Sequence, residues 1–161
     1  MHDFTIRIAA KKDMAAASKF ATPIVKELGF YNKEQMARNI YEMSAKELKA
    51  NLKIYRDSVI IAITKEGKIV GLLTHFVGLN HVDWLDWILV DQRFRKKGLG
   101  KAMLNYAIQN AKRNGCHKIW CDTDPNNKQA IKFFKRMGFR KIGIARKHSF
   151  GQDVIFWERL F

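Results

Sequence analysis

Apolar residues repeat along this chain in two ways, at every second residue as in a strand and at every third or fourth residue as in a helix. The clearest case begins at residues 81–90, HVDWLDWILV, where nearly continuous apolarity predicts a strand buried on both faces. A helical stripe of Leu99, Met103 and Tyr106 follows after a short turn. A buried strand that passes into an amphipathic helix restricts the chain to folds in which helices cover a sheet.

The same periodicity predicts the element order β-α-α-β-β-β-α-β-α-β-β. Asn32 with Gln35, and Ser44 three residues before Glu47, resemble capping boxes that begin helices. The strands are expected at residues 4–8, 58–64, 69–77, 81–90, 117–122, 139–145 and 154–161. The first helices are expected at residues 13–21, with a second piece over 23–29, and at 32–43, with a short continuation after Ser44. Two later helices are expected at residues 98–114 and 124–138. We therefore expect an α/β (α+β) fold: one domain over residues 1–161, with a mixed central sheet of six to seven strands and helices on both faces.

Positive charge is concentrated in one part of the chain. The protein has 30 Lys and Arg against 15 Asp and Glu, a net charge of +15. Residues 91–147 hold 16 of the basic and 3 of the acidic residues, whereas residues 1–90 hold 13 and 10. Since a concentrated positive field attracts anions, the candidate partners of residues 91–147 are a phosphorylated cofactor, a nucleic acid and an anionic membrane.

Several classes of protein are disfavoured. No apolar run approaches the roughly 20 residues of a transmembrane helix, and residues 1–12 lack a signal-peptide core, so a cytoplasmic protein is expected. Cys116 and Cys121 are too few for a disulfide framework, and no zinc-binding pattern accompanies them. No metal site is expected.

An anion site is expected at residues 95–100, RKKGLG, where the buried strand passes into the helix. The first turn of a helix has unpaired backbone N–H groups, and glycine lets an anion approach them. The loop is not a P-loop, because Arg95 and Ala102 replace the first Gly and the Ser or Thr of GxxxxGK[ST]. Met103 likewise replaces the third glycine of a dinucleotide-binding loop.

Two segments around this loop resemble motifs of one family. Residues 90–104, VDQRFRKKGLGKAML, resemble motif A of the GNAT superfamily of acyl-CoA-dependent N-acetyltransferases, whose core Q/R-x-x-G-x-G/A is met by Arg95, Gly98 and Gly100. Residues 127–139, NKQAIKFFKRMGF, are similar to motif B, N-x-x-A-x-x-x-Y-x-x-x-G-F. The resemblance is close over residues 85–140, and it implies the fold of that family with acetyl-CoA as cosubstrate.

The resemblance also implies how acetyl-CoA is bound. The backbone of residues 95–100 would hold the pyrophosphate, and Ile88 and Val90 would pair with the pantetheine arm where the fourth strand diverges from the fifth. Asn127 and Lys128 would lie near the pantetheine and the ribose. The residues expected to bind acetyl-CoA are Ile88, Leu89, Val90, Arg95, Lys96, Lys97, Gly98, Leu99, Gly100, Lys101, Asn127, Lys128 and Phe134.

Phe134 departs from motif B. In many family members this residue is a tyrosine that protonates the departing thiolate, and phenylalanine has no proton to donate. Three alternatives follow: another group such as Tyr106 or His81 supplies the proton, no acid is needed, or the protein binds acyl-CoA without efficient transfer. The position of Phe134 on the apolar stripe of its helix favours a packing role.

A carboxylate on the fourth strand often acts as the general base in this family. Asp86 lies in the apolar sequence WLDW, a setting that calls for a hydrogen-bond partner or a raised pKa. It is therefore the first candidate for the base, and structural hydrogen bonding is its alternative role. The weaker candidates are Asp83, His75 and His81, with Tyr31 and Tyr41 as candidate walls of the acceptor pocket.

These features predict an N-acetyltransferase in which a primary amine of a small molecule or protein attacks acetyl-CoA directly. Acceptor specificity is expected in residues 20–57 and 145–152. The alternative is a basic CoA-binding or nucleic-acid-binding regulatory module with little activity, although no helix-turn-helix, zinc or RRM signature is present. No membrane partner is expected, and the oligomeric state is expected to be a monomer or a homodimer.

Overall fold

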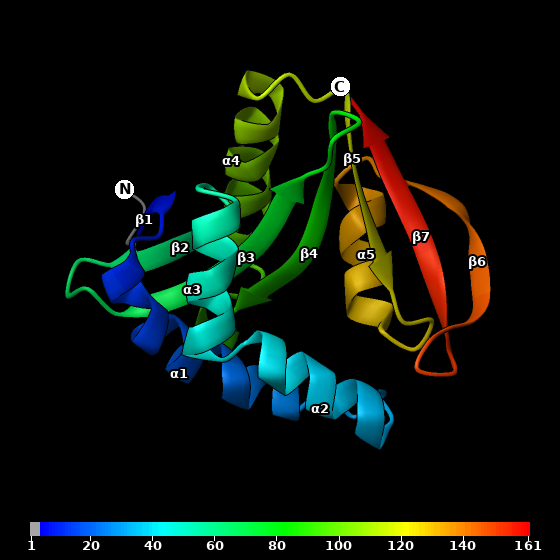
Figure 1. The fold of residues 1–161 in the computed structure, drawn as a ribbon, viewed down its shortest axis with the longest axis horizontal. Helices are drawn as coiled ribbons and strands as arrows, with labels where there is room; N and C mark the ends of the chain where they lie inside the picture. Colours follow the sequence, from blue (N-terminus) through cyan, green and yellow to red (C-terminus); the bar gives the residue numbers. More distant parts are fainter. Residues whose placement is uncertain (1–3) are drawn as a thin grey trace.

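One mixed sheet organises residues 4–161, the part of the chain that the computed structural model describes; residues 1–3 of the predicted domain lie outside it. The sheet has seven strands in the order β1-β2-β3-β4-β5-β7-β6 (Figure 1). They are β1 (Phe4–Ile8), β2 (Val59–Thr64), β3 (Ile69–Val77), β4 (Val82–Val90), β5 (Lys118–Thr123), β6 (Arg140–Ser149) and β7 (Gln152–Leu160). Of the described neighbours, β4 and β5 alone run parallel, which confirms the predicted mixed sheet.

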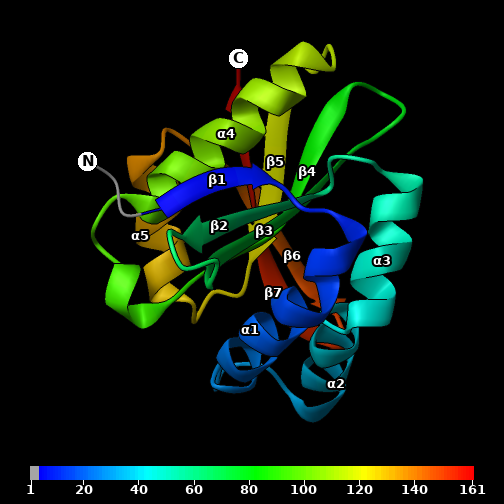
Figure 2. The ribbon, with the colours of Figure 1, turned by 90° about the vertical axis from the view of Figure 1, so that its left-hand side faces the viewer.

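Helices cover both faces of the sheet, as predicted. They are α1 (Met14–Lys26), α2 (Lys33–Glu42), α3 (Ala45–Ile54), α4 (Leu99–Arg113) and α5 (Lys128–Arg136), with short 3-10 turns η1 (Lys11–Asp13) and η2 (Gln92–Phe94). Figure 2 shows α4 on one side of the sheet and α1 and α2 on the other.

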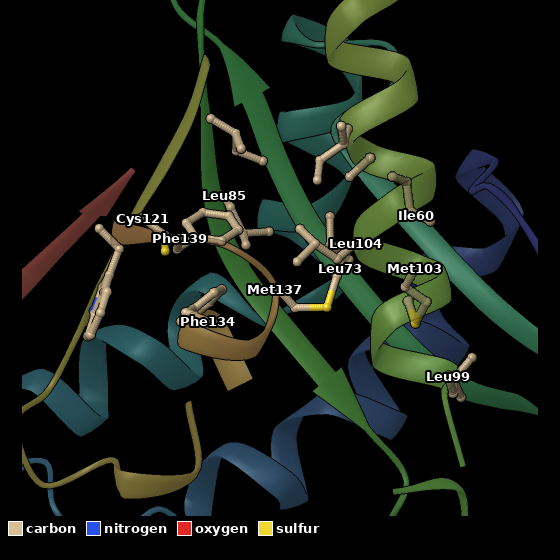
Figure 3. Close-up of a cluster of buried hydrophobic side chains, with 14 of the residues drawn as sticks. Ile60, Leu73, Leu85, Leu99, Met103, Leu104, Cys121, Phe134, Met137 and Phe139 are labelled. Carbon is tan, nitrogen blue, oxygen red and sulfur yellow. The ribbon is translucent and has the colours of Figure 1, made fainter. Parts of the chain in front are cut away.

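Two hydrophobic cores result, one on each face. The first joins α4 and α5 to the sheet through side chains such as Leu73, Met103 and Phe134 (Figure 3). The second joins α1 and α3 to the opposite face, and it contains Leu72. Adjacent residues of β3 thus belong to opposite cores, because successive side chains of a strand point to opposite faces.

Two predictions for the N-terminal helices are wrong. The break expected at Pro23 is absent, and α1 continues through it to Lys26. Its stripe of Met14, Ala17, Ala21 and Val25 is fully buried in the second core, and this packing outweighs the one helical hydrogen bond that proline removes. The short continuation expected after Ser44 is α3, a separate helix of ten residues.

The last helix begins later than predicted. Asn127 is the N-cap of α5, and its Oδ1 accepts a hydrogen bond from the N–H of Ala130 at 3.0 Å. Asp124, the predicted first residue, instead accepts from the N–H of Asn126 at 2.7 Å, which holds a turn ahead of the helix. The last two strands are longer than predicted and meet at the turn around Gly151, which has a φ of 78°.

Candidate active site

β4 and β5 diverge, and a cleft lies in the opening. Residues 82–84 pair with residues 118–120, and no further pairing joins the two strands (Figure 1). β4 remains paired with β3 as far as Val90, so the other edge of its last residues has backbone groups free of sheet pairing. The cleft has a volume of about 1070 Å³ and reaches from α2 to the start of α4.

Asp86 lines this cleft because β4 contains a β-bulge. Thr74 of β3 pairs with Trp87, and His75 pairs with Leu85, which leaves Asp86 as the extra residue. The Asp86 carboxylate accepts a hydrogen bond from Thr74 Oγ1 at 3.1 Å. The Asp86 side chain is exposed, and it lines the cleft among atoms of α2 and β5. Burial by these atoms, and then the charge of Glu42, raises the pKa of Asp86 to about 7.

The end of the cleft beside α4 is cationic and lies against a glycine turn. Gly98 precedes α4 with a φ of 86°, a left-handed conformation that favours glycine. A Cβ on Gly98 would meet no atom within 4 Å, so there is open space beside this glycine at the start of the helix. The basic side chains that line this end are Arg95, Lys96, Lys101 and Arg136.

Most of the residues predicted to bind acetyl-CoA line the cleft. They are Ile88, Leu89, Val90, Arg95, Lys96, Gly98, Gly100, Lys101, Asn127 and Phe134. Lys97, Leu99 and Lys128 do not line it. Leu99 is buried in the first core, and Lys128 Nζ donates to the carbonyl of Pro125 at 2.8 Å.

Phe134 is a core residue whose edge borders the cleft. It is 4% exposed, and its ring centroid lies 5.1 Å from that of Phe139 (Figure 3). The ring centroid of Phe133 lies 5.4 Å away. The two groups considered as substitutes for a motif B tyrosine, Tyr106 and His81, do not line the cleft.

The other end of the cleft is acidic, a feature that the sequence did not reveal. Its lining carboxylates are Glu42, Asp86, Asp122, Asp124 and Asp153. Burial raises the pKa of Asp122, and the charge of Glu42 adds to the increase. Asp122 alternates with the buried residues Cys121 and Thr123 in β5, which is a visible signal, but nothing in the sequence brings α2 beside this strand.

Aromatic side chains share the acidic end. Tyr31 and Trp87 both line it, and their ring centroids lie 6.4 Å apart in an edge-on arrangement. Burial raises the pKa of Tyr31, and the charges of Asp122, Asp124 and Asp86 raise it further. The Tyr31 hydroxyl therefore stays protonated over the ordinary pH range. Tyr41, the other candidate wall, is outside the lining and bonds to Glu47 at 2.6 Å.

Asp83, the weaker candidate for the base, lies outside the cleft lining. It is fully buried, and its Oδ1 lies 2.9 Å from Nδ1 of His75, which is also buried. Neither residue lines the cleft, and His81 does not either. We therefore keep Asp86 alone as the candidate base.

The turn between β6 and β7 is attached to the segment that precedes α2. The N–H of Asn32 donates to Gln152 Oε1 at 2.7 Å, and Asn32 Nδ2 donates to the carbonyl of Phe150 at 2.8 Å. Gln152 Nε2 in turn donates to the carbonyl of Phe30 at 2.8 Å. These bonds join residues 20–57 to residues 145–152, the two segments in which acceptor specificity was expected.

Residues 4–161 contain neither a metal-binding cluster nor a membrane-spanning helix. No group of three or more His, Cys, Asp or Glu side chains there is arranged to hold a metal ion. No helix in that range is both long and apolar enough to cross a bilayer.

A family model matches most of the elements around the cleft. The model described as the acetyltransferase (GNAT) family matches residues 27–139, from the segment before α2 to the start of β6. The chain belongs to the GNAT family. The family fold extends over nearly the whole chain. The crystal structure of the PaiA N-acetyltransferase of Thermoplasma acidophilum in complex with coenzyme A superposes on this chain with a TM-score of 0.82 at 17% identity. The superposition covers 99% of this chain and 100% of that one.

Sequence relatives in the GNAT family match shorter regions. The spermine/spermidine N(1)-acetyltransferase of Bacillus subtilis is 41% identical over 61 residues, which are 37% of this chain and 40% of that protein. The [ribosomal protein bS18]-alanine N-acetyltransferase of Escherichia coli K12 is 27% identical over 86 residues, 53% of this chain and 57% of that protein. The matches thus span about half of these relatives or less.

Proposed function

We propose that the protein is an N-acetyltransferase that transfers the acetyl group of acetyl-CoA to a primary amine. One observation carries this proposal: the opening between β4 and β5 has a cationic glycine turn at one end and the carboxylate of Asp86 at the other. An anionic donor and a cationic acceptor can therefore approach the same strand from opposite ends.

The residues at the cationic end fit coenzyme A. Unpaired N–H groups in the first turn of α4 are suited to a pyrophosphate, and Arg95, Lys96 and Lys101 add positive charge. The free edge of β4 near Ile88 and Val90 offers backbone groups to a pantetheine amide. When bound, acetyl-CoA supplies a thioester carbonyl that an amine can attack.

Asp86 would make the amine nucleophilic. An ammonium ion has no lone pair, so it must lose a proton before it attacks, and a carboxylate with a pKa of about 7 can accept that proton near neutral pH. Holding both reactants at one strand supplies the proximity that direct attack requires, and no covalent enzyme intermediate is needed.

The acceptors named for the sequence relatives, a polyamine and a protein alanine, are both amines. They support an amine acceptor for this chain. Because one is a small molecule and the other a protein, they leave the kind of amine open.

Calorimetry with CoA, together with thiol release from acetyl-CoA over an amine panel, tests the proposal. We expect Gly98→Val and Gly100→Val to lower CoA affinity at least about 100-fold, because a side chain at Gly98 would fill open space that the phosphates need and one at Gly100 would press on Phe133 and Val90 and displace the turn. Gly67→Val is the matched control, since Gly67 has a φ of 79°, lies in the β2–β3 turn and does not line the cleft.

Two results would overturn the proposal. If Gly98→Val and Gly100→Val bind CoA like the parent protein, the assigned cofactor site is wrong. If CoA binds but no amine of any class releases thiol, the protein is a CoA-binding module, the alternative that its basic charge allows.

A further inference from the structure

We infer that the acidic end of the cleft selects an amine that carries a second positive charge, and that Asp122 binds this second charge while Glu42 adds negative potential to the same end. The inference rests on the proposed function and deepens it, because it names the class of amine that Asp86 would deprotonate.

The first observation is a local reversal of charge. The protein has a net charge of +15, yet Glu42, Asp86, Asp122, Asp124 and Asp153 gather at one end of one cleft. Arg38 is the basic side chain that lines this end among the described residues, and its Nε bonds to Glu42 at 2.7 Å. In a protein that otherwise repels cations, this end is the place where a cation is favoured.

The second observation is that Asp122 lacks a hydrogen-bond donor from any side chain among residues 4–161. Its neighbours are already bonded: Asp124 accepts from the N–H of Asn126 at 2.7 Å, and Asp153 accepts from the N–H of Lys147 at 2.8 Å. Burial and Glu42 both disfavour the charged form of Asp122, whereas His148 favours it. The backbone N–H of Asp122 itself also favours the charged form, and an ammonium group of a ligand would add the charged donor that no side chain supplies.

The third observation is an unpartnered amide at the same end. Asn39 of α2 lines the cleft and is 2% exposed, and its Nδ2 has no hydrogen-bond partner. Its Oδ1 accepts from Gln35 Nε2 at 2.8 Å, and Gln35 Oε1 bonds to the hydroxyl of Ser149. A hydroxyl both donates and accepts, so this chain of amides can be reversed, which would present the Asn39 oxygen to an ammonium.

The aromatic rings complete a site for an organic cation. Tyr31 and Trp87 line the cleft beside the carboxylates, and the face of an aromatic ring attracts an ammonium or its neighbouring methylene groups. Two amines on one alkyl chain match this arrangement, with one nitrogen at Asp86 and the other at Asp122. A free diamine has this chemistry, and so does an N-terminal lysine, whose two nitrogens are separated by five carbons.

The experiment compares 1,5-diaminopentane with 5-aminopentan-1-ol, which has the same length and one charge fewer. With the full-length protein and saturating acetyl-CoA, we expect kcat/KM for the diamine to exceed that for the amino alcohol by about tenfold or more, the effect of one charged hydrogen bond. Calorimetry on the CoA complex should show that the diamine binds more tightly than the amino alcohol, a comparison that does not depend on turnover.

Variants assign the preference to the two carboxylates. Asp122→Asn and Glu42→Gln should each bring the ratio of the two kcat/KM values toward one, whereas Glu34→Gln should keep it. Glu34 is the matched control because it lies exposed on α2 and outside the cleft lining. A variant with the Tm and CoA affinity of the parent protein is folded. Because Asp122 and Glu42 lie on different elements, one folded variant is enough to test the inference.

The outcomes separate this inference from the proposed function. Equal kcat/KM for the two amines, or a preference that survives both Asp122→Asn and Glu42→Gln, would overturn the inference while acetyl transfer stands. CoA binding without acetylation of either amine counts against the proposed function, and diamine binding by calorimetry then decides the inference. A peptide with N-terminal lysine, compared with the same peptide beginning with norleucine, distinguishes a protein acceptor from a free diamine.

Discussion

At the scale of single residues, the bulge at Asp86 decides which side chain of β4 lines the cleft as a carboxylate. A regular strand would pair every residue of β4 with β3, and the extra residue instead turns a carboxylate toward the opening. The same crowding that raises the pKa of Asp86 to about 7 makes it a stronger proton acceptor than an ordinary aspartate.

Turnover should therefore rise with pH through about 7 as Asp86 loses its proton, with no descending limb from a tyrosine, since residue 134 is phenylalanine. Asp86→Asn should lower kcat by about 100-fold or more and leave acetyl-CoA affinity unchanged, because the base lies on the acceptor side. Thiol release between pH 5 and pH 9 measures the pH dependence of the parent protein and the loss of kcat in the variant. A variant that keeps the parent rate at every pH would contradict the assignment.

Asp86 should also cost stability at neutral pH. Its pKa is higher in the folded protein than in the unfolded chain, so the folded state binds more protons between about pH 4 and pH 7. The free energy of unfolding therefore falls as the pH rises through this window. Asp86→Asn should raise Tm at pH 8 by on the order of a few °C and have little effect at pH 4. Equal changes in Tm at both pH values would rule out this linkage.

At the scale of elements, the β6–β7 turn and the start of α2 act as one wall of the acidic end. Gln152 joins them through Asn32 and Phe30, and its Nε2 also lies 3.3 Å from Asp124 Oδ2. One side chain thus links two segments that are about 120 residues apart in the sequence.

Gln152→Ala should loosen this wall. We expect KM for the amine to rise by about tenfold, since three hydrogen bonds that position the acceptor end are lost, with little change in CoA affinity. Gln109→Ala, on an exposed position of α4, is the matched control. The wall has no part in acceptor binding if Gln152→Ala and Gln109→Ala give the same KM.

At the scale of the whole molecule, charge is sorted along the cleft. Four basic residues of the 91–147 segment, Arg95, Lys96, Lys101 and Arg136, line the cleft, and the carboxylates of α2, β4 and β5 gather at the end away from the turn before α4. This arrangement would present opposite potentials to the anionic donor and the cationic acceptor of the proposed reaction.

CoA affinity should consequently fall as salt rises. Between about 0.05 M and 0.5 M NaCl we expect a loss of roughly threefold to tenfold, because the cationic side chains are partly exposed and the backbone N–H groups are screened less. Calorimetry over this range measures the slope. A duplex DNA that binds more tightly than CoA, with a steeper salt dependence, would instead favour the nucleic-acid module.

The sequence by itself determined the local parts of this protein. The turn at residues 95–100, the strand before it and the helix after it depend on neighbouring residues, so glycine, charge and periodicity sufficed to predict them. The burial expected on both faces of that strand was wrong, because residues 84–90 line the cleft and Asp86 is exposed there. The same holds for Asn32 and Ser44 as helix caps, whose side chains accept from backbone N–H groups three residues on.

The tertiary structure decided whatever joins distant segments. Asn32 illustrates the limit: it caps α2 as predicted, but its own N–H bonds to Gln152 of β7 and not to the Gln35 side chain of a capping box. Asp122 illustrates the same limit at the site, because its role cannot be recognised from its place in a strand. The divergence of β4 and β5 opens the cleft that Asp122 lines, and α2 adds Glu42 to the same lining. Electrostatic coupling depends on distance in space, and only packing of the whole sheet against its helices sets that distance.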